Sequence, residues 1–318
     1  MYYTCYQLKF KAESPIFVGS TKIGIIQQTK RYIPGKTLWG AITANVTREL
    51  IDAGVKYSSV LYGDIGKCIE DCVKTTYFYP TTDSNDVLIP RFTENGLKYG
   101  QKSKNELSEN AFEFTFIKSF VSTATVGDRG AAKDESLHET EYIVNKIKSG
   151  DRCEQVYWTG YMFIRSCEND RYTLNNHVDF GKIGLECGKH SVKLIDALKQ
   201  LYVGGDSRYG FGKLSLLPPK NNKSKPVFNF DINLSSLKFD INSNKPIFAH
   251  LKLNNIDKKA YLGDIEPFVG RMYDKNGFGR YLKSHGIVFM PGTCFTDDIP
   301  DIEIKPFGLL EKYGAKDS

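Results

Sequence analysis

The alternation of hydrophobic and polar residues predicts several strands along the chain. Residues 5–12 alternate as in a half-buried strand, and residues 112–117 do the same. Residues 156–164 and 212–217 predict two more strands, with turn residues close to each. The C-terminal part is again predicted to be rich in strands, which we place at 227–234 and 247–253.

Two segments have the spacing of amphipathic helices. The first is predicted to follow Thr37 as its N-cap and to end at Ala53-Gly54. Its apolar residues recur every four positions and therefore share one face: Leu38, Ile42, Val46 and Leu50. Residues 191–202 predict the second helix. Trp39 is expected to pack in the core, and the alternative is contact with a neighbouring subunit or a flipped base.

In chain order these segments give strand, helix, strands, helix and strand, which is the order of a ferredoxin-like (RRM-like) unit. We therefore predict an α+β fold in which residues 1–218 form an RRM-like domain with a long insertion at about 57–155. A polar, proline-flanked linker over 218–226 follows. Residues 226–318 are predicted to form a smaller second domain, ferredoxin-like or β-rich. Gly-Phe-Gly plus a basic residue occurs at both 210–213 and 277–280, which hints at duplication.

Composition and charge narrow the setting of the chain. Its 318 residues carry a net charge of +6, and residues 182–225 hold nine Lys/Arg against three Asp/Glu. Such a local excess suits a polyanion, although a solvated basic face is the alternative. No apolar run approaches the length of a membrane span, and the N-terminus lacks the layout of a signal peptide. Seven widely scattered cysteines favour reduced thiols and a cytoplasmic protein over a disulfide framework.

The most distinctive segment is a glycine-rich loop between the second predicted helix and the strand at 212–217. It contains four glycines in nine residues, with one arginine and two aromatic residues among them. Glycine amides can line an anion-binding concavity, an arginine can add a bidentate phosphate contact, and aromatic rings can stack on bases. The alternative is a tight helix-to-strand connection with a solvated arginine. The loop is neither a Walker A loop nor a dinucleotide-binding fingerprint.

Three motifs, taken in order, resemble the RAMP superfamily of CRISPR effector proteins. Residues 33–41, Ile-Pro-Gly-Lys-Thr-Leu-Trp-Gly-Ala, are similar to the element that begins the first helix of that family's RRM-like fold. The loop at 204–212 is similar to the family's glycine-rich loop, which contacts guide RNA. Residues 128–132, followed by Leu137, Glu139 and Glu141, resemble a pattern before the central strand. The resemblance covers residues 1–217 in outline.

Within this family, two features are most similar to Cas-five-type subunits of type III-D-like systems. They are the Trp39 variant of the first motif and a C-terminal glycine-basic element formed by 270–271, 277–280 and 291–292. The resemblance implies a subunit that binds crRNA, caps its 5′ handle and contacts other effector subunits, especially a backbone RAMP subunit. It implies only indirect contact with target nucleic acid, no membrane and no cofactor. The RNA-binding residues expected from the motifs and the local charge are Arg31, Lys36, Arg129, Gly204, Gly205, Ser207, Arg208, Tyr209, Gly210, Phe211, Gly212, Lys213, Arg271 and Arg280.

Two other functions within the resemblance stay open: a guide-coating, Cas-seven-type backbone subunit and a metal-independent endoribonuclease that processes precursor crRNA. An RRM-like protein without a CRISPR role is a third. Target-cleaving type III backbone subunits carry an aspartate before the first motif, whereas residues 19–30 here contain no acidic residue. We therefore expect a binder without catalytic residues or bound metal.

Two sets of residues carry the remaining chemistry. His138, beside Glu139 and Glu141, is the first candidate for a ribonuclease base. Cys68 and Cys72 could supply two zinc ligands, but a closed structural site needs four. Cys153 or Cys167 would have to arrive from elsewhere in the fold.

Overall fold

The computed structural model describes residues 2–82, 86–100, 106–127, 131–169, 171–222, 226–253, 256, 259–274 and 277–314, with side chains except at 271–274, 277–281 and 285. Strands predominate over helices, so the protein is α+β, as predicted. Within these ranges, no helix combines the length and the apolar character needed to cross a bilayer.

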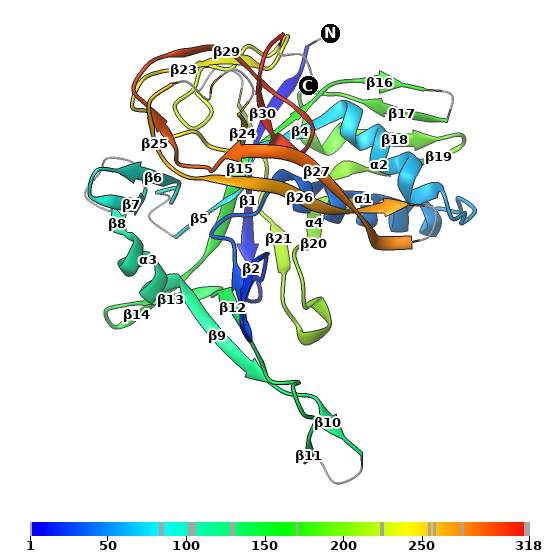
Figure 1. Cartoon of the computed structure of the whole chain (residues 1–318). Coiled ribbons are helices and arrows are strands. Elements are labelled where there is room, and N and C mark those ends of the chain that lie inside the picture. Colours follow the sequence, from blue (N-terminus) through cyan, green and yellow to red (C-terminus); the bar gives the residue numbers. More distant parts are fainter. Residues whose placement is uncertain are drawn as a thin grey trace.

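A seven-stranded antiparallel sheet organises the N-terminal two thirds of the chain (Figure 1). Strand β1 (Thr4–Ala12) lies inside it, between β15 (Tyr157–Ile164) and β21 (Lys213–Leu216). The other strands of the sheet are β20 (Gln200–Tyr202) beside β21, β4 (Val73–Thr75) and β5 (Tyr79–Thr81) beside β15, and β22 (Lys220–Asn221) beside β1. The strands predicted at 5–12, 156–164 and 212–217 are confirmed. Because β22 pairs with β1, part of the predicted linker is docked on the sheet.

Alternate residues of β1 face two different hydrophobic cores, as successive side chains of a strand must. Tyr6, Leu8 and Phe10 pack in a core that also holds the buried faces of the helices. These helices are α1 (Gly35–Asp52), α2 (Leu61–Cys72) and α4 (Leu194–Lys199). Cys5 and Phe163 belong to a second core, which is built mainly from residues 227–310. The C-terminal part of the chain therefore covers the face of the sheet opposite the helices.

Helix α1 confirms the first predicted helix. Its four apolar residues at spacing four are all buried. It begins at Gly35, two residues before the predicted cap Thr37, and no side chain caps it. Trp39 packs edge-on against Phe307, with ring centroids 5.3 Å apart, and its Nε1–H donates to the carbonyl of Gly66 at 2.9 Å. Trp39 is thus a packing residue, as expected.

Residues 109–116 form helix α3 (Glu109–Phe116), so the strand predicted at 112–117 is wrong. Ser108 caps the helix by accepting a hydrogen bond from the amide of Ala111 at 3.3 Å. Phe112 and Phe116 lie four residues apart on one buried face, and Phe112 stacks on Tyr99 with ring centroids 3.9 Å apart. The exposed Phe114 between them made the segment look like an alternating strand.

Three other predicted elements are shorter than expected or absent. Within 191–202 only α4 is helical, because β19 (His190–Lys193) precedes it and β20 follows it. The strand predicted at 227–234 is wrong, since Val227 and Phe230 form only an isolated bridge around a turn with positive φ at its two central residues. At 247–253 only β24 (Leu251–Lys252) is a strand.

A six-stranded sheet organises the C-terminal part. Its order is β23 (Lys238–Ile241), β29 (Ile299–Ile304), β30 (Leu310–Lys312), β24, β27 (Gly277–Phe289) and β26 (Ile265–Asp274). Beside it, β25 (Tyr261–Leu262) pairs with β28 (Cys294–Phe295). The second Gly-Phe-Gly, at 277–279, lies in strand β27 whereas the first lies in a loop, so the two matches do not share a local structure. The domain division predicted near 218–226 stays a prediction.

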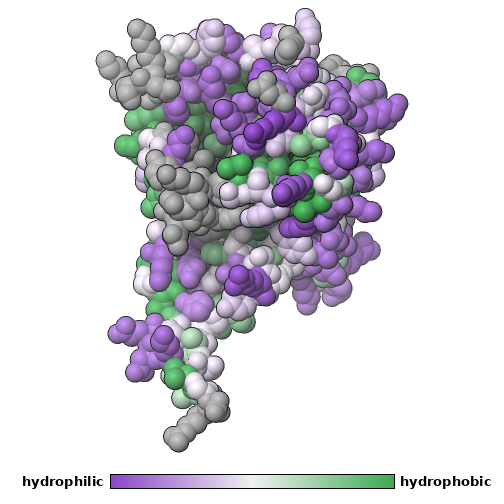
Figure 2. Space-filling model, turned by 90° about the vertical axis from the view of Figure 1, so that its right-hand side faces the viewer, coloured by the Kyte–Doolittle hydropathy of each residue, from purple (hydrophilic) through white to green (hydrophobic). Residues whose placement is uncertain are grey.

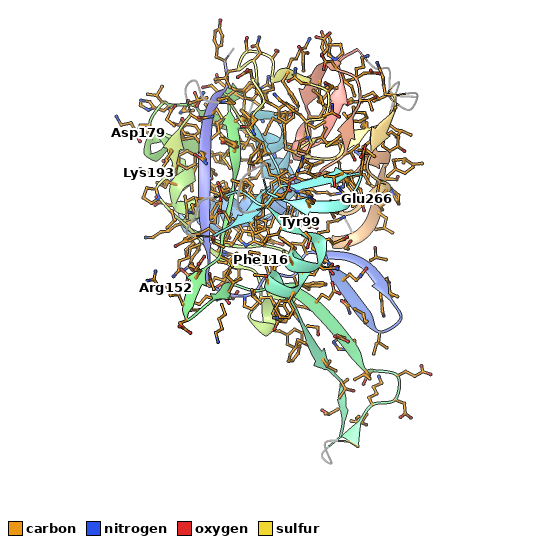
Figure 3. The ribbon with its side chains drawn as sticks, turned by 90° about the vertical axis from the view of Figure 1, so that its left-hand side faces the viewer. Tyr99, Phe116, Arg152, Asp179, Lys193 and Glu266 are labelled. Atoms are coloured by element: carbon orange, nitrogen blue, oxygen red, sulfur yellow. A yellow bond between two sulfur atoms is a disulfide. The ribbon has the colours of Figure 1, made fainter. Side chains whose placement is uncertain are left out.

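A narrow arm projects from the body of the protein (Figures 1 and 3). Its sheet has the order β2 (Gly19–Ile23), β3 (Ile26–Thr29), β12 (His138–Ile143) and β9 (Ile117–Ser122), and β10 (Thr125–Val126) pairs with β11 (Ala131–Ala132) at the tip. Phe116, labelled in Figure 3, lies where α3 leads into the arm. The arm takes part of the predicted insertion at 57–155, but α2, β4 and β5 in the same range belong to the body.

Smaller sheets and hairpins complete the described structure. They are the sheet of β6 (Pro90–Thr93), β7 (Gly96–Tyr99) and β8 (Leu107–Ser108), the hairpin of β13 (Lys146–Ser149) and β14 (Arg152–Gln155), and the sheet of β16 (Cys167–Glu168), β17 (Tyr172–Asn175), β18 (Gly184–Cys187) and β19. The structure joins Cys72 to Cys167 as a disulfide. This differs from the expectation that all thiols are reduced, because the fold brings two cysteines distant in sequence together.

Candidate nucleic-acid interface

The glycine-rich loop joins β20 to β21 and packs against residues 14–18. Three of the amides that the sequence analysis offered to RNA already donate hydrogen bonds within the protein. These bonds run from Gly205 to the carbonyl of Phe17 at 2.9 Å, from Gly210 to that of Ser207 at 3.1 Å and from Gly212 to that of Pro15 at 2.8 Å. In this structure, the three amides hold the loop closed, so an anion on this surface would be held by side chains.

Two of the loop glycines are required by close backbone approach. Gly204 has φ +80°, and a Cβ there would lie 2.0 Å from the carbonyl oxygen of Phe17. Gly212 has φ +85°, and its Cβ would lie 2.2 Å from the carbonyl oxygen of Val203. L-residues disfavour both the conformation and the contact. The tight connection that we considered as an alternative therefore accounts for these two glycines.

The turn η2 (Ser207–Tyr209) carries the exposed side chains of the loop. Ser207, Arg208 and Tyr209 all face solvent, and 75% of Tyr209 is exposed. Within the described part of the chain, Arg208 forms no ion pair or hydrogen bond. Phe211 instead meets Tyr142 of β12 edge-on, with ring centroids 5.4 Å apart. The turn thus presents an unpaired guanidinium beside an exposed ring, while Phe211 fixes the loop to the root of the arm.

Residues 29–31 lead from the segment under the glycine-rich loop to α1. The amide of Val18 donates to the hydroxyl of Thr29, and the amide of Lys30 donates to the carbonyl of Val18. Arg31, a predicted RNA ligand, donates to Glu113 of α3 at 2.5 Å and approaches Glu141 of β12 at 3.4 Å. Burial would lower its pKa, but the hydrogen bond to Glu113 and the two carboxylate charges raise it. Arg31 therefore connects α3 to the arm in this structure and is not available to a phosphate.

Lys36, in the first turn of α1, is a cation enclosed by the protein. Its Nζ is buried without a hydrogen-bond partner among the described residues and lies 5.7 Å from the ring centroid of Phe307. It sits under Gly270 of β26, where a Cβ would come within 2.2 Å of Nζ. Burial, helped by the charge of Lys283, lowers the pKa of Lys36. An unpaired ammonium at the positive end of a helix is a place where an anion is stabilised.

A buried polar network lies behind Lys30 and was not visible in the sequence. His250 is fully buried, and its Nε2 lies 2.6 Å from Oε1 of Glu266, labelled in Figure 3. The hydroxyl of Tyr77 lies 2.7 Å from Nδ1 and that of Tyr32 lies 3.1 Å from Nε2. Lys30 Nζ also contacts Glu266 at 3.0 Å. The arrangement fits the tautomer in which Nε2–H donates to Glu266.

The pKa values of this pair follow from burial and from the pairing itself. Burial lowers the pKa of His250 and so favours the neutral ring, although the hydrogen bond to Glu266 opposes this. Burial would raise the pKa of Glu266, but the hydrogen bond from His250 and the charge of Lys30 hold it at about 2. The network fixes the base of β26 to the segment that leads into α1. Residues separated by more than 150 positions meet here, and no local pattern indicates this.

The arm presents large apolar side chains to solvent, interspersed with polar ones (Figure 2). They lie on both sides of its sheet and near its tip: Ile23, Ile25, Phe120, Val121, Val126 and Leu137. Apolar residues exposed together in this way mark surfaces that bind a partner. Arg129, a predicted RNA-binding residue, lies outside the described residues. Arg271 and Arg280 lie in the β26–β27 hairpin, and their side chains are outside the described part of the structure.

His138, the candidate ribonuclease base, lies on β12 within the arm. Its Nε2 is 2.8 Å from the hydroxyl of Ser122, and its Nδ1 is 2.9 Å from the carbonyl of Ser136. Both ring nitrogens therefore have partners inside the arm. These contacts give His138 a structural role in joining β12 to β9.

Comparison with known proteins shows that the fold of this chain is similar to that of solved structures. No protein-family profile matches the chain, and no curated protein matches it. A chain of the type III-B Cmr-beta complex bound to cognate target RNA and AMPPnP is 13% identical, with 91% of this chain and 85% of that chain covered and a TM-score of 0.50. At this identity the similarity concerns the fold alone.

Two further chains come from the same kind of complex. One, from the complex bound to cognate target RNA, is 12% identical, with 91% and 86% covered and a TM-score of 0.48. The other, from the apo state, is 10% identical, with 67% of this chain and 96% of that chain covered and a TM-score of 0.41.

Proposed function

We propose that this protein is a crRNA-binding subunit of a CRISPR ribonucleoprotein and that it caps the 5′ handle of the guide without cleaving it. The observation that carries the proposal is the turn Ser207–Tyr209, where the exposed guanidinium of Arg208, which has no carboxylate partner among the described residues, lies beside the exposed ring of Tyr209. The likeness of fold to a chain of an RNA-bound Cmr-beta complex supports it. So does the strand order β21–β1–β15–β4, which is that of a ferredoxin-like unit whose crossovers contain α1 and α4.

The side chains of this site would make different contributions to RNA binding. Arg208 would contact phosphates, and Lys213, half-buried at the start of β21, would add a second charge. Tyr209 would stack on a base because its ring is exposed and unhindered. Lys36 Nζ is enclosed in this structure, so Lys36 would contribute through its positive charge at the start of α1 and not by direct contact. Phosphate contacts release counterions, so binding should weaken steeply as salt rises.

Capping is preferred to processing because His138 is engaged within the arm and residues 19–29 form a hairpin without an acidic side chain. A guide-coating backbone subunit is the second candidate function. The exposed apolar side chains of the arm favour contact with a neighbouring subunit, which both roles need. The number of copies of this chain on each guide RNA would distinguish the capping role from the guide-coating role.

The central test compares Arg208→Ala with Arg48→Ala. Arg48 is exposed on α1, hydrogen-bonded to Asn45 and not part of the glycine-rich loop, so it serves as a charge-matched control. A charge-assisted contact is worth about 1.5–3 kcal/mol. We therefore expect Arg208→Ala to weaken filter binding of handle-bearing RNA by about tenfold or more at moderate salt, with little effect of Arg48→Ala. Unchanged affinity in Arg208→Ala would refute the assignment of the site.

Sequencing of RNA that co-purifies with the natively expressed complex tests the role. A uniform repeat-derived 5′ end, protected by one copy of this chain, supports capping. Protection along the spacer by several copies supports the backbone role. Cleavage of repeat RNA by the protein alone in EDTA would support processing instead.

A further inference from the structure

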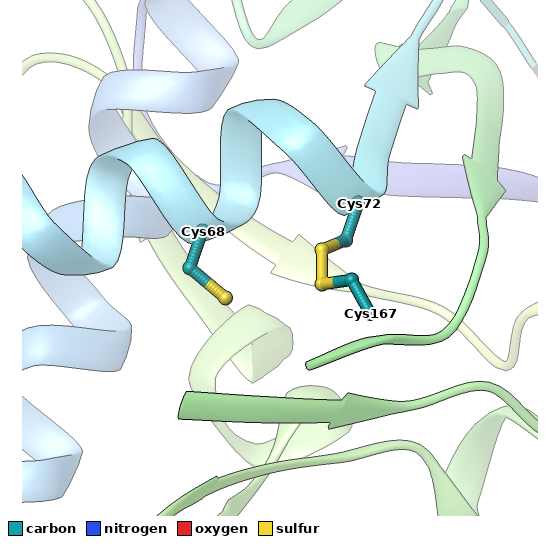
Figure 4. Close-up of side chains that lie close together, drawn as sticks. All are labelled: Cys68, Cys72 and Cys167. Carbon is teal, nitrogen blue, oxygen red and sulfur yellow. A yellow bond between two sulfur atoms is a disulfide. The ribbon is translucent and has the colours of Figure 1, made fainter. Parts of the chain in front are cut away.

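Three cysteine sulfurs meet at the C-terminal end of α2, on the face of the central sheet away from the second core (Figure 4). Cys68 and Cys72 are four residues apart and therefore lie on one face of the helix. Cys167 reaches them from β16, which follows β15. The three Sγ atoms lie within 4.8 Å of one another, with Cys68 and Cys72 buried and Cys167 half-buried.

The disulfide accounts for only two of these three sulfurs. Cys72 and Cys167 are joined, and Cys68 remains beside them as a buried thiol. Cys68 therefore takes no part in the disulfide, although its sulfur lies within 4.8 Å of both paired sulfurs.

The spacing suits a metal ion that all three sulfurs would share. Thiolates about 2.3 Å from a zinc ion at the tetrahedral angle are about 3.8 Å apart, which lies within the 4.8 Å span of the cluster. Soft thiolate ligands select zinc and similar ions over magnesium or calcium. Helical spacing supplies two ligands from α2, and a separate strand supplies the third, so the ion would connect two elements.

We propose that the reduced protein binds one zinc ion through the thiolates of Cys68, Cys72 and Cys167, in place of the disulfide. A dithiol reductant first supplies two electrons and two protons, which convert the disulfide to two thiols. Zinc then displaces one proton from each of the three thiols, releases three protons and leaves a zinc tris-thiolate of net charge −1. The fourth position would be taken by water.

The role of such an ion would be structural. The backbone amide of Arg165 already donates to the carbonyl of Cys72 at 3.0 Å, so the end of α2 and the strand after β15 are held side by side. Zinc would fix the same junction where reductants remove the disulfide. This inference rests on the cysteine cluster alone and is independent of the RNA-binding proposal.

The experiment measures zinc uptake by the full chain after complete reduction and removal of metal. Zinc is titrated in competition with a chromophoric chelator, and cobalt is substituted to detect thiolate-to-metal charge transfer. Cys68→Ser is the decisive variant because it keeps both partners of the disulfide. Cys153→Ser is the control, since Cys153 is exposed on β14 outside the cluster.

We expect one zinc per chain in the wild type and in Cys153→Ser, and an affinity at least tenfold lower in Cys68→Ser with a weaker charge-transfer band. The proposal is overturned if the reduced wild type takes up no zinc. It is also overturned if Cys68→Ser binds zinc as tightly as the wild type. Counting alkylated thiols by mass spectrometry before and after zinc addition confirms that all three cysteines start reduced and become protected together.

Discussion

Replacing Gly204 with alanine tests whether the glycine-rich loop is closed by a contact that only glycine permits. A left-handed conformation costs an L-residue about 1–2 kcal/mol. The new Cβ would also lie 2.0 Å from the carbonyl oxygen of Phe17, which is a backbone atom and cannot rotate away. The same oxygen accepts the hydrogen bond from Gly205 at 2.9 Å. Moving the two segments apart would weaken that bond, at a cost of about 1 kcal/mol.

Gly210→Ala is the matched control for this substitution. Gly210 has a similar backbone conformation, with φ +88°, but no atom lies within 4 Å of its would-be Cβ. We therefore expect Gly210→Ala to lower the free energy of unfolding by about 1–2 kcal/mol, and Gly204→Ala to lower it by about 3 kcal/mol or more. Urea unfolding followed by tryptophan fluorescence measures both, because Trp39 and Trp158 belong to the first core.

Equal losses in the two variants would refute this reasoning, because they would show that the carbonyl of Phe17 does not restrict residue 204. RNA binding gives a second comparison. Displacement of the loop in Gly204→Ala also moves the turn that carries Arg208, whereas Gly210→Ala leaves the contacts between the loop and residues 14–18 intact. A larger loss of handle affinity in Gly210→Ala would contradict the assignment of these contacts.

Three further substitutions test the other charged groups. Lys36→Met should leave the free energy of urea unfolding unchanged or raise it, because no partner is lost, while it weakens RNA binding in a filter assay; lower stability would contradict this. Arg31→Met removes the cation that Glu113 and Glu141 share, although Glu141 still accepts from the amide of Thr29, and should lower stability by about 1–3 kcal/mol, whereas a loss of RNA affinity at unchanged stability would make Arg31 a ligand. Glu266→Gln tests the pKa of about 2. The free energy of unfolding of the wild type should exceed that of the variant by up to about 3 kcal/mol above pH 4.5, and this difference should be lost as the pH falls towards 2. A difference in stability that persists at low pH would contradict the pairing.

The elements that the sequence predicts well are those with one dominant period. The buried stripe of α1 has a single interpretation, and so does the alternation of β1. The sequence predicts a strand at α3 because Phe112, Phe114 and Phe116 recur at every second position. In the helix only Phe112 and Phe116 are buried. The cap at Ser108 was the local signal that could have decided between the two.

Part of the candidate site could likewise be predicted from the sequence, and part could not. Glycine content located the loop, and the fold leaves Arg208 and Tyr209 exposed, while their contact with RNA stays a prediction. The engagement of the loop amides depends on residues 14–18, which lie almost 200 positions earlier in the chain. Arg31 is equally basic in sequence, but the fold places it between Glu113 and Glu141. Pairings of this kind depend on tertiary contacts, so composition could not separate Arg31 from Arg208.

The place of β1 has a consequence for how the protein is made. It leaves the ribosome well before its two neighbours, which begin only at Tyr157 and Lys213. An apolar strand with two unpaired edges must therefore wait for most of the chain, and such edges promote association between incomplete chains. Pairings this distant in sequence also slow closure of the sheet. A nascent chain released before residue 157 would lack both neighbours of β1 and would depend on chaperones to stay unaggregated.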